Sequence, residues 1–232
     1  MSDELSKPHR IWREWRGFIL FVVIMLLFRS AVADWNQVPT GSMVPSILEG
    51  DRIVVDKTAY DLRVPFTFYR LARFGNPERS DIITFESPAD GKLLIKRVIG
   101  IPGDSVELRD NLLLVNNQPA SYTAIDHNEL SNEVRERIAS EPVSEERVLG
   151  AERSIMIETK PGRVRAANFG PATVPADHYL VLGDNRNNSR DSRFIGFIHR
   201  DLVLGKANSI AFSLDYENYY LPRRERFFLE LN

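Results

Sequence analysis

A serine in an irregular turn is the first residue of this sequence that is suited to chemistry. Ser42 lies in PTGSMVPSILEGD, residues 39–51, with Gly41 before it and Pro45 close behind. Because Pro45 disfavours helical geometry at Val44 and would remove an amide donor from a helix, we expect Ser42 to lie outside a helix interior. A hydroxyl on such a turn is a candidate nucleophile. It is weak unaided, so it needs a neighbouring base.

A lysine inside an apolar run is the candidate base. Lys96 lies in LLIKRVIGI, residues 93–101, which predicts a strand that places Lys96 and Arg97 on opposite faces. One interpretation is an edge strand with both charges in solvent. The other is a desolvated lysine, whose pKa burial lowers until a neutral amine is available near pH 7–8. Such an amine can act as a general base, and Ser-Lys pairs are an attested variant of the catalytic triad.

A third candidate segment is the polar run GDNRNNSRDSR, residues 183–193, which directly follows the apolar residues 179–182. Its Gly, Asp, Asn and Ser residues are typical of turns. It is either a solvated loop or a loop held between buried segments, which can present hydroxyl and carboxylate groups to a site. The nearby histidines, His178 and His199, form no triad pattern with the residues around them.

The N-terminal segment predicts contact with a membrane. Residues 17–28, GFILFVVIMLLF, are uncharged and follow a segment with basic residues and two tryptophans. They are either the core of a cleavable secretory signal, with the AVA sequence at 31–33 as its cleavage site, or part of a membrane anchor. We favour the anchor because Arg29 interrupts the signal pattern. The predicted topology is residues 1–16 in the cytoplasm, 17–35 across the membrane, and the rest outside the cytoplasm.

The remaining chain predicts a mainly β fold. Short β-branched and apolar runs alternate with turn residues, which favours coiled antiparallel sheets. The expected strands are 52–56, 81–86, 93–101, 105–108, 112–115, 179–182 and 202–212. Residues 128–153 are rich in Glu and Arg and predict a short amphipathic helix followed by loops. We therefore expect a catalytic β-domain formed by 36–118 and 176–232, with 119–175 as an inserted subdomain.

Composition excludes several classes of function. The 232 residues carry a net charge of −2, which gives no footprint for nucleic-acid binding. The absence of cysteine excludes disulfides and thiolate metal sites. The sequence has no HExxH motif, so it gives no support to a zinc hydrolase.

The three segments resemble the motifs of a known family. Residues 39–51, 93–104 and 183–193 are similar to the serine box, the lysine box and the GDNRDNSxDSR box of bacterial type I signal peptidases. Their order and spacing, with an apolar segment just before the serine, match that family over about residues 17–212. The resemblance implies coiled antiparallel β-sheets of the signal-peptidase type, with an inserted subdomain and an N-terminal transmembrane helix.

The resemblance also implies a role for each matching residue. Ser42 is the expected nucleophile and Lys96 the general base, with the Ser42 amide and the Thr40 hydroxyl as the oxyanion hole. Ser189 is expected to orient Lys96, while Asp191 and Arg193 pair and hold the third loop. Apolar residues are expected to line the pockets for small substrate side chains: Val38, Met43, Ile47, Ile53, Leu94 and Ile95. No metal or organic cofactor is expected.

The implied function is a membrane-anchored serine endopeptidase that cleaves signal peptides from exported preproteins after small-x-small motifs. Its expected partners are preprotein signal peptides, the lipid bilayer and the protein-export translocon. Its expected location is the cytoplasmic (inner) membrane, single-pass, with the catalytic domain on the periplasmic side. Two alternatives stay open: a Ser-Lys peptidase with one dedicated substrate, and a non-catalytic peptide-binding β-domain of an export complex. Two departures from the family pattern are Thr40 in place of Ser and Asn187 in place of Asp, and the second is expected to loosen the third loop.

Overall fold

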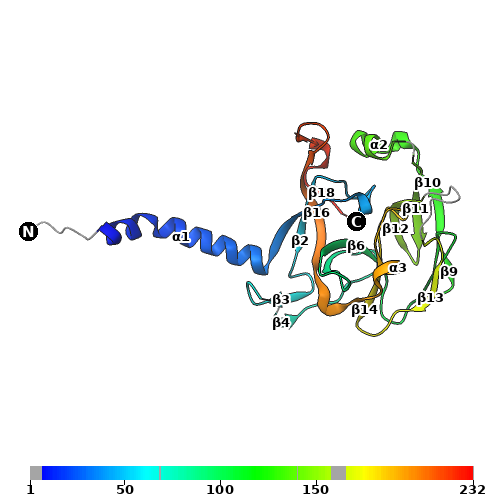
Figure 1. Cartoon of the computed structure of the whole chain (residues 1–232), viewed down its shortest axis with the longest axis horizontal. Coiled ribbons are helices and arrows are strands. Elements are labelled where there is room, and N and C mark those ends of the chain that lie inside the picture. Colours follow the sequence, from blue (N-terminus) through cyan, green and yellow to red (C-terminus); the bar gives the residue numbers. More distant parts are fainter. Residues whose placement is uncertain (1–6, 68, 140, 158–165, 232) are drawn as a thin grey trace, which may run out of the picture.

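A long helix projects from a body of β-sheets in this computed structural model (Figure 1). The helix, α1 (Lys7–Ala31), leads almost directly into the first strand, β1 (Ala33–Gln37). The segments that the structure describes are residues 7–67, 69–139, 141–157 and 166–231.

The main sheet is antiparallel and contains the strand of Lys96, called the lysine strand below. Its strand order is β1-β2-β16-β5-β6-β14-β15, and β17 and β18 both pair with β16. Its strands beyond β1 are β2 (Asp51–Asp56), β5 (Ile82–Glu86), β6 (Leu93–Gly100), β14 (His178–Leu182), β15 (Ile198–His199), β16 (Val203–Asp215), β17 (Leu221–Pro222) and β18 (Leu229–Glu230). The predicted mainly β fold with antiparallel sheets is thus confirmed.

A second antiparallel sheet packs beside the first. Its order is β13-β7-β8-β9, with bounds β7 (Ser105–Arg109), β8 (Leu112–Val115), β9 (Gln118–Pro119) and β13 (Phe169–Thr173). The turn between β7 and β8 is made by Asp110 and Asn111, whose φ angles of 50° and 67° these residue types tolerate. Buried residues of the two sheets share one apolar cluster, including Val106, Leu113 and Leu180.

The inserted segment contains more regular structure than its composition suggested. The predicted helix is present as α2 (Asn132–Ile138), with the Ser131 hydroxyl capping its first turn. The loops expected after it were wrong, because β11 (Val143–Val148) and β12 (Ala151–Met156) form a hairpin that joins β10 (Ser121–Ala124) in a third sheet. Three positions of β11 are buried: Val143 packs with α2 and the loop after Ser42, Val148 joins the cluster of the second sheet, and Glu146 binds Arg153 and Arg186. Part of the predicted insertion, residues 158–165, lies outside the described residues.

A small hairpin lies against the body end of α1. Strands β3 (Asp61–Arg63) and β4 (Arg70–Arg73) form it, and the amide of Phe66 at its tip donates to the Ser30 hydroxyl. Its exposed apolar side chains are Phe66, Tyr69, Leu71 and, just after it, Phe74.

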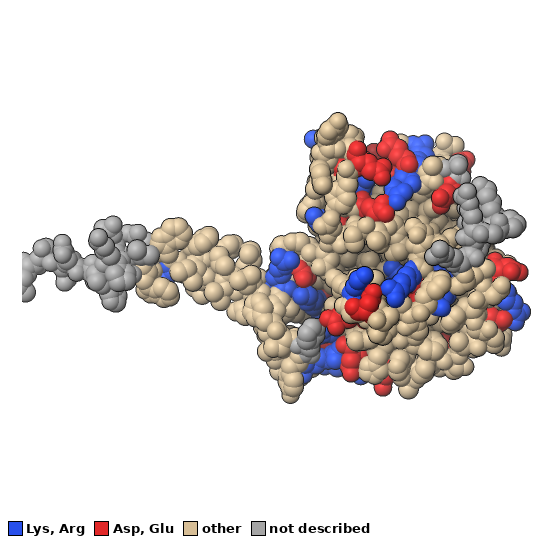
Figure 2. Space-filling model, viewed as in Figure 1, with Lys and Arg blue, Asp and Glu red and all other residues tan. Residues whose placement is uncertain are grey.

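The helix α1 exposes a run of large apolar side chains. Phe18 to Phe28 includes ten such residues with at least two fifths of their surface exposed, and Figure 2 shows this part of α1 as a tan column between charged ends. No helix in the described segments is both long and apolar enough to cross a bilayer. At its end, Arg29 pairs with Asp34 at 2.8 Å and its guanidinium lies 4.9 Å above the Trp35 ring.

The remaining helical elements are short. They are η1 (Gly41–Met43), η2 (His127–Glu129), α3 (Ser192–Ile195), η3 (Arg200–Leu202) and η4 (Arg224–Arg226).

Candidate active site

Ser42 lies outside a helix interior, as the sequence predicted, on a single short turn of 3₁₀ helix. The turn η1 is flanked by extended residues, Thr40 and Val44, and the Val44 amide donates to the Gly41 carbonyl to close it. Val44 is extended (φ −63°, ψ 134°) because Pro45 follows it. Ser42 is only 7% exposed, so its hydroxyl is fixed in a largely buried place.

The lysine strand delivers a buried amine to this hydroxyl. Strand β6 pairs with β5 on one side, with Lys96 opposite Ile83. The Lys96 Nζ lies 2.6 Å from Ser42 Oγ and donates to the Ile95 carbonyl at 2.8 Å. Lys96 is 3% exposed, which favours the desolvated lysine over the solvated edge strand.

The electrostatic environment of Lys96 prepares it to lose a proton. Burial lowers the pKa of Lys96 to about 8, against the opposing attraction of the Asp191 and Asp184 carboxylates. A neutral amine is therefore well populated near pH 8. It can accept a proton from the hydroxyl beside it.

Arg97, the neighbouring cation, points to the other side of β6 and is also buried. Its Nε and Nη2 donate to the two carboxylate oxygens of Asp184, both at 2.9 Å. Since Asp184 belongs to the polar third segment, this pair joins the lysine strand to that loop. Strand alternation thus gives the two adjacent cations different partners, a hydroxyl and a carboxylate.

The third segment is a fixed loop and not a solvated one. Asp191 and Arg193 form a bidentate pair with two contacts of 2.8 Å, and Asp191 also accepts from the Gly183 amide. Asn185 connects this loop to the serine turn, since its amide donates to the Ser42 carbonyl and its side chain to the Gly41 carbonyl. The Asn187 side chain accepts from Asn111 at 3.1 Å, so a neutral contact holds the position where the family pattern has Asp.

Ser189 lies at the site without a hydrogen bond to Lys96. Its Oγ is buried and has no hydrogen-bond partner among the described residues. A Cβ added to Gly183 would lie 2.3 Å from Ser189 Oγ and 2.5 Å from the Ser42 carbonyl oxygen, so this close approach requires glycine. The orienting role of Ser189 stays a prediction.

One pocket is lined by both Ser42 and Lys96, and a smaller pocket adjoins it. The first is lined by Thr40, Ser42, Leu94, Lys96, Asn187, Asn188, Ser189, Arg190 and Phe194. The other is lined by Asn36, Gln37, Val38, Pro39, Ile53, Thr84, Leu93, Leu94 and Ile95, and shares Leu94 with the first. Of the six residues predicted to line substrate pockets, four line the second pocket: Val38, Ile53, Leu94 and Ile95. Met43 and Ile47 are fully buried in the apolar cluster beneath it.

Comparison with known proteins identifies the family. The family model described as "Signal peptidase, peptidase S26" matches residues 12–212. The chain belongs to the signal peptidase family, peptidase S26. It is similar to Signal peptidase I of Pseudomonas fluorescens, 31% identical over 220 residues, which cover 90% of this chain and 75% of that protein. Signal peptidase I of Rickettsia bellii (strain OSU 85-389) is 33% identical over 220 residues, covering 87% and 73%.

A solved structure also matches. It is a signal peptidase I from Enterococcus faecalis V583, 32% identical, which covers 57% of this chain and 97% of that one with a TM-score of 0.34.

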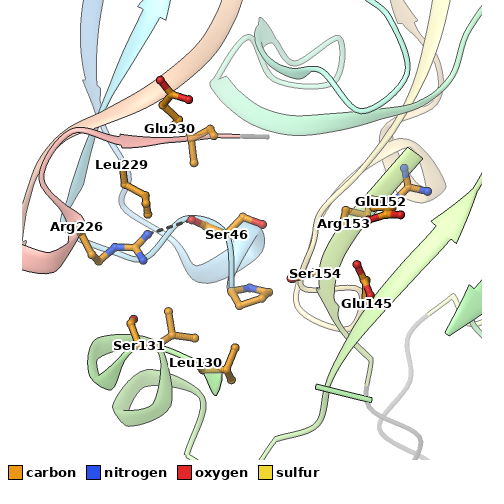
Figure 3. A pocket seen from close by; sticks show the side chains of 13 residues that line it. Ser46, Leu130, Ser131, Glu145, Glu152, Arg153, Ser154, Arg226, Leu229 and Glu230 are labelled. Carbon is orange, nitrogen blue, oxygen red and sulfur yellow. Dashed lines mark hydrogen bonds between the residues drawn. The ribbon is translucent and has the colours of Figure 1, made fainter. Parts of the chain in front are cut away.

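Arg226, which lies outside the residues that the family model matches, helps to fix the loop that follows Ser42. Arg226, 3% exposed, binds the fully buried Asp51 carboxylate with Nε–Oδ1 at 3.0 Å and Nη2–Oδ2 at 2.7 Å. Its Nη2 also donates to the Ser46 carbonyl at 3.0 Å (Figure 3). Asp51 accepts from the Leu48 amide as well, so Arg226 and Asp51 together fix the loop that follows the nucleophile.

We expect Arg226→Ala to lower the free energy of unfolding by about 3–5 kcal/mol, because it leaves the Asp51 carboxylate buried and unpaired. Urea unfolding followed by circular dichroism measures this. The double variant Arg226→Met/Asp51→Asn removes both charges and should recover part of the loss. A loss of less than about 1 kcal/mol for Arg226→Ala would contradict this account, because exposed ion pairs contribute stability in that range.

Proposed function

We propose that this chain is a serine endopeptidase that removes signal peptides from exported preproteins after small-x-small motifs. The observation that carries the proposal is the buried contact of 2.6 Å between the Lys96 amine and the Ser42 hydroxyl, in a member of the S26 family. A buried amine with a lowered pKa, placed on a hydroxyl, is what an acyl-transfer site needs. A non-catalytic peptide-binding domain would have no use for a buried cation at that place.

The proposed reaction is acyl transfer. Lys96 takes the Ser42 proton as Oγ attacks the scissile carbonyl carbon, and the resulting ammonium then gives a proton to the leaving amine. The new Ser42 ester is hydrolysed when Lys96 takes a proton from water, which attacks the ester carbonyl carbon. The Lys96 ammonium then returns this proton to Ser42 Oγ as the ester bond breaks and the free acid leaves. Each cycle therefore returns Ser42 and Lys96 to their starting forms.

The oxyanion hole is proposed at the start of the same turn. The Ser42 amide lies in the first turn of η1, where the turn itself supplies no acceptor for it. The Thr40 hydroxyl makes no capping bond to that turn and lines the same pocket as Ser42. Both groups are thus available as donors to the developing oxyanion.

The substrate is proposed to bind as an added strand beside β6. Strand β14 pairs with β6 at Arg97, Val98 and Gly100, while β5 pairs along residues 93–97. In the described structure the first half of β6 thus keeps one edge without a partner strand, next to the pocket between residues 36–39 and 93–95. That pocket encloses about 40 Å³ between Val38, Ile53 and Ile95, room for a small side chain such as that of alanine.

The proposed domain organisation follows the sequence prediction. A catalytic β-domain consists of 36–118 and 176–232, and the insertion of 119–175 packs on the serine loop through Val134 and Ile138. The partners we propose are preprotein signal peptides, the lipid bilayer and the protein-export translocon.

The test is cleavage of preproteins by the full chain in detergent. We expect processing of several unrelated preproteins with Ala at −1 and −3, and no processing by Ser42→Ala. Cleavage of a single preprotein from a broad set would favour a dedicated peptidase. A folded chain that cleaves none and still binds signal peptides would overturn the proposal in favour of a binding domain.

We further propose that α1 anchors the enzyme in the cytoplasmic membrane, with the N-terminus in the cytoplasm and the β body outside it. Its apolar stretch, residues 17–28, is about 18 Å long, shorter than a bilayer core of about 30 Å. Arg16 and Arg29 flank that stretch and can reach the headgroups while the bilayer thins locally. The exposed aromatic residues of the β3–β4 hairpin, at the body end of α1, support contact with the same surface.

Ile24→Arg should move the chain from the membrane pellet to the carbonate-extractable fraction, since a central arginine costs about 2.5–3.5 kcal/mol on insertion. Leu112→Arg, at an exposed apolar position on β8, is the matched control and should stay in the pellet. Extraction of neither variant, or of both equally, would contradict an anchor in α1.

A further inference from the structure

A third pocket continues the cleft on the far side of the Ser42–Lys96 pair. It is lined by Val44, Arg137, Glu141, Met156, Asn185, Asn187 and Asn188. It shares Asn187 and Asn188 with the pocket around the catalytic pair, which in turn shares Leu94 with the small apolar pocket. The three pockets thus form one row with the nucleophile in the middle.

The inference rests on the proposed function, which fixes the direction in which a substrate chain runs along this row of pockets. Residues before the scissile bond occupy the apolar pocket between residues 36–39 and 93–95. The chain after the scissile bond must therefore leave past Asn187 and Asn188, toward the third pocket. We propose that this pocket is a subsite for the first residues of the mature protein, and that Glu141 makes it favour basic over acidic side chains.

The wall of this subsite is built by the inserted segment and held against the nucleophile turn. Arg137 of α2 pairs with Glu49 at 2.6 Å. Its Nη2 would lie 3.3 Å from a Cβ placed on Gly41, the residue before the nucleophile. On the other wall, Asn185 bonds to the turn through the Gly41 and Ser42 carbonyls. Both walls are thus fixed to the residues that position Ser42.

The ion pair at the subsite wall determines the charge that a substrate side chain meets there. Arg137 is already neutralised by Glu49. The Glu141 carboxylate forms no ion pair with another described residue. The three side chains together carry a net charge of −1. A lysine or arginine after the scissile bond is therefore attracted to the subsite, whereas an aspartate or glutamate is repelled.

The test compares two preproteins that share one signal peptide with Ala at −1 and −3 and differ only in beginning the mature chain with Lys-Lys or Glu-Glu. For the unmodified enzyme in detergent at low salt, we expect kcat/KM to be about two- to fivefold higher for the Lys-Lys substrate, the range of an exposed charge pair. High salt should reduce this ratio, because the screening length is only about 10 Å already at 0.1 M.

Two variants and one control decide the origin of the ratio. Glu141→Gln should bring the ratio close to one, and Glu141→Lys should invert it. Glu152→Gln makes the same charge change at a residue that lines a different pocket, behind the serine loop, and should keep the original ratio. An unchanged ratio in Glu141→Lys would overturn the subsite and leave the proposed function intact. Cleavage of neither substrate by the unmodified enzyme would overturn both.

Discussion

Lys96→Ala is expected to lower kcat for preprotein cleavage by about 10³-fold or more. The side chain that it removes lies 2.6 Å from the nucleophile and is the only base in contact with it among the described residues. General base catalysis contributes about 10²–10⁴-fold, and loss of one member of a catalytic pair leaves the other nearly inactive. The measurement is single-turnover cleavage of a model preprotein in detergent. The control is Lys206→Ala, which removes a lysine of β16 that pairs with Asp81 and should keep its activity.

Lys96→Met separates loss of the base from loss of the fold. The pKa of Lys96 is about 8 in the folded chain, against 10.5 for an unperturbed lysine, so the unfolded chain holds the proton more tightly. The resulting penalty on folding is fully present below pH 8 and disappears as the pH rises toward 10.5. At pH 7 it is about 3 kcal/mol.

Because methionine fills a similar volume without a charge, Lys96→Met should be inactive and yet more stable than the unmodified chain at pH 7. Thermal unfolding at pH 7 and at pH 10 measures the difference, which should shrink at the higher pH. An inactive Lys96→Met that unfolds at a lower temperature at both values would show that Lys96 stabilises the fold. Retention of cleavage by either variant would remove Lys96 as the base.

The local pattern of the sequence was sufficient to find the central pair. Pro45 excluded a continuing helix at Ser42, and period-two alternation placed Lys96 and Arg97 on opposite faces of one strand. The turn-forming residues of 183–193, bounded by apolar segments, indicated a held loop, which the Asp191–Arg193 pair provides. In each case the signal lies within about ten residues, the range over which backbone preferences act.

The residues that support the pair could not be found in this way. Arg226 and Asp51 are 175 positions apart, and nothing near either residue indicates which of many arginines meets which carboxylate. The sequence of the insertion predicts a charged helix with loops, since its apolar residues are sparse. They become a core only where Val134 and Ile138 meet Val44 and Leu48 of the serine loop. Pairings of this kind are fixed by the closed fold and leave no local signal.

The pH dependence of kcat/KM tests the state of the amine directly. Because the reaction needs neutral Lys96, and its pKa in the folded chain is about 8, activity should rise with pH and level off above about pH 8. Below that value kcat/KM should fall tenfold for each pH unit. At pH 6 it should be about 100-fold lower than on the plateau. With a histidine base, the descending limb of the kcat/KM profile would instead begin near pH 6.5.

Two further profiles assign this limb to Lys96. His178→Gln and His199→Gln should leave its position unchanged, since neither histidine lines the pocket around Ser42. Asp191→Asn should move it to lower pH, because the Asp191 carboxylate is the main attraction that keeps the pKa of Lys96 from falling further. Partial unfolding would move the profile to higher pH, because the unfolded chain holds the Lys96 proton more tightly, so a loss of stability in Asp191→Asn cannot imitate a shift to lower pH. A limb that stays in place when Asp191 loses its charge and moves when a histidine is replaced would assign the proton transfer to an imidazole and reject the Ser-Lys mechanism for this chain.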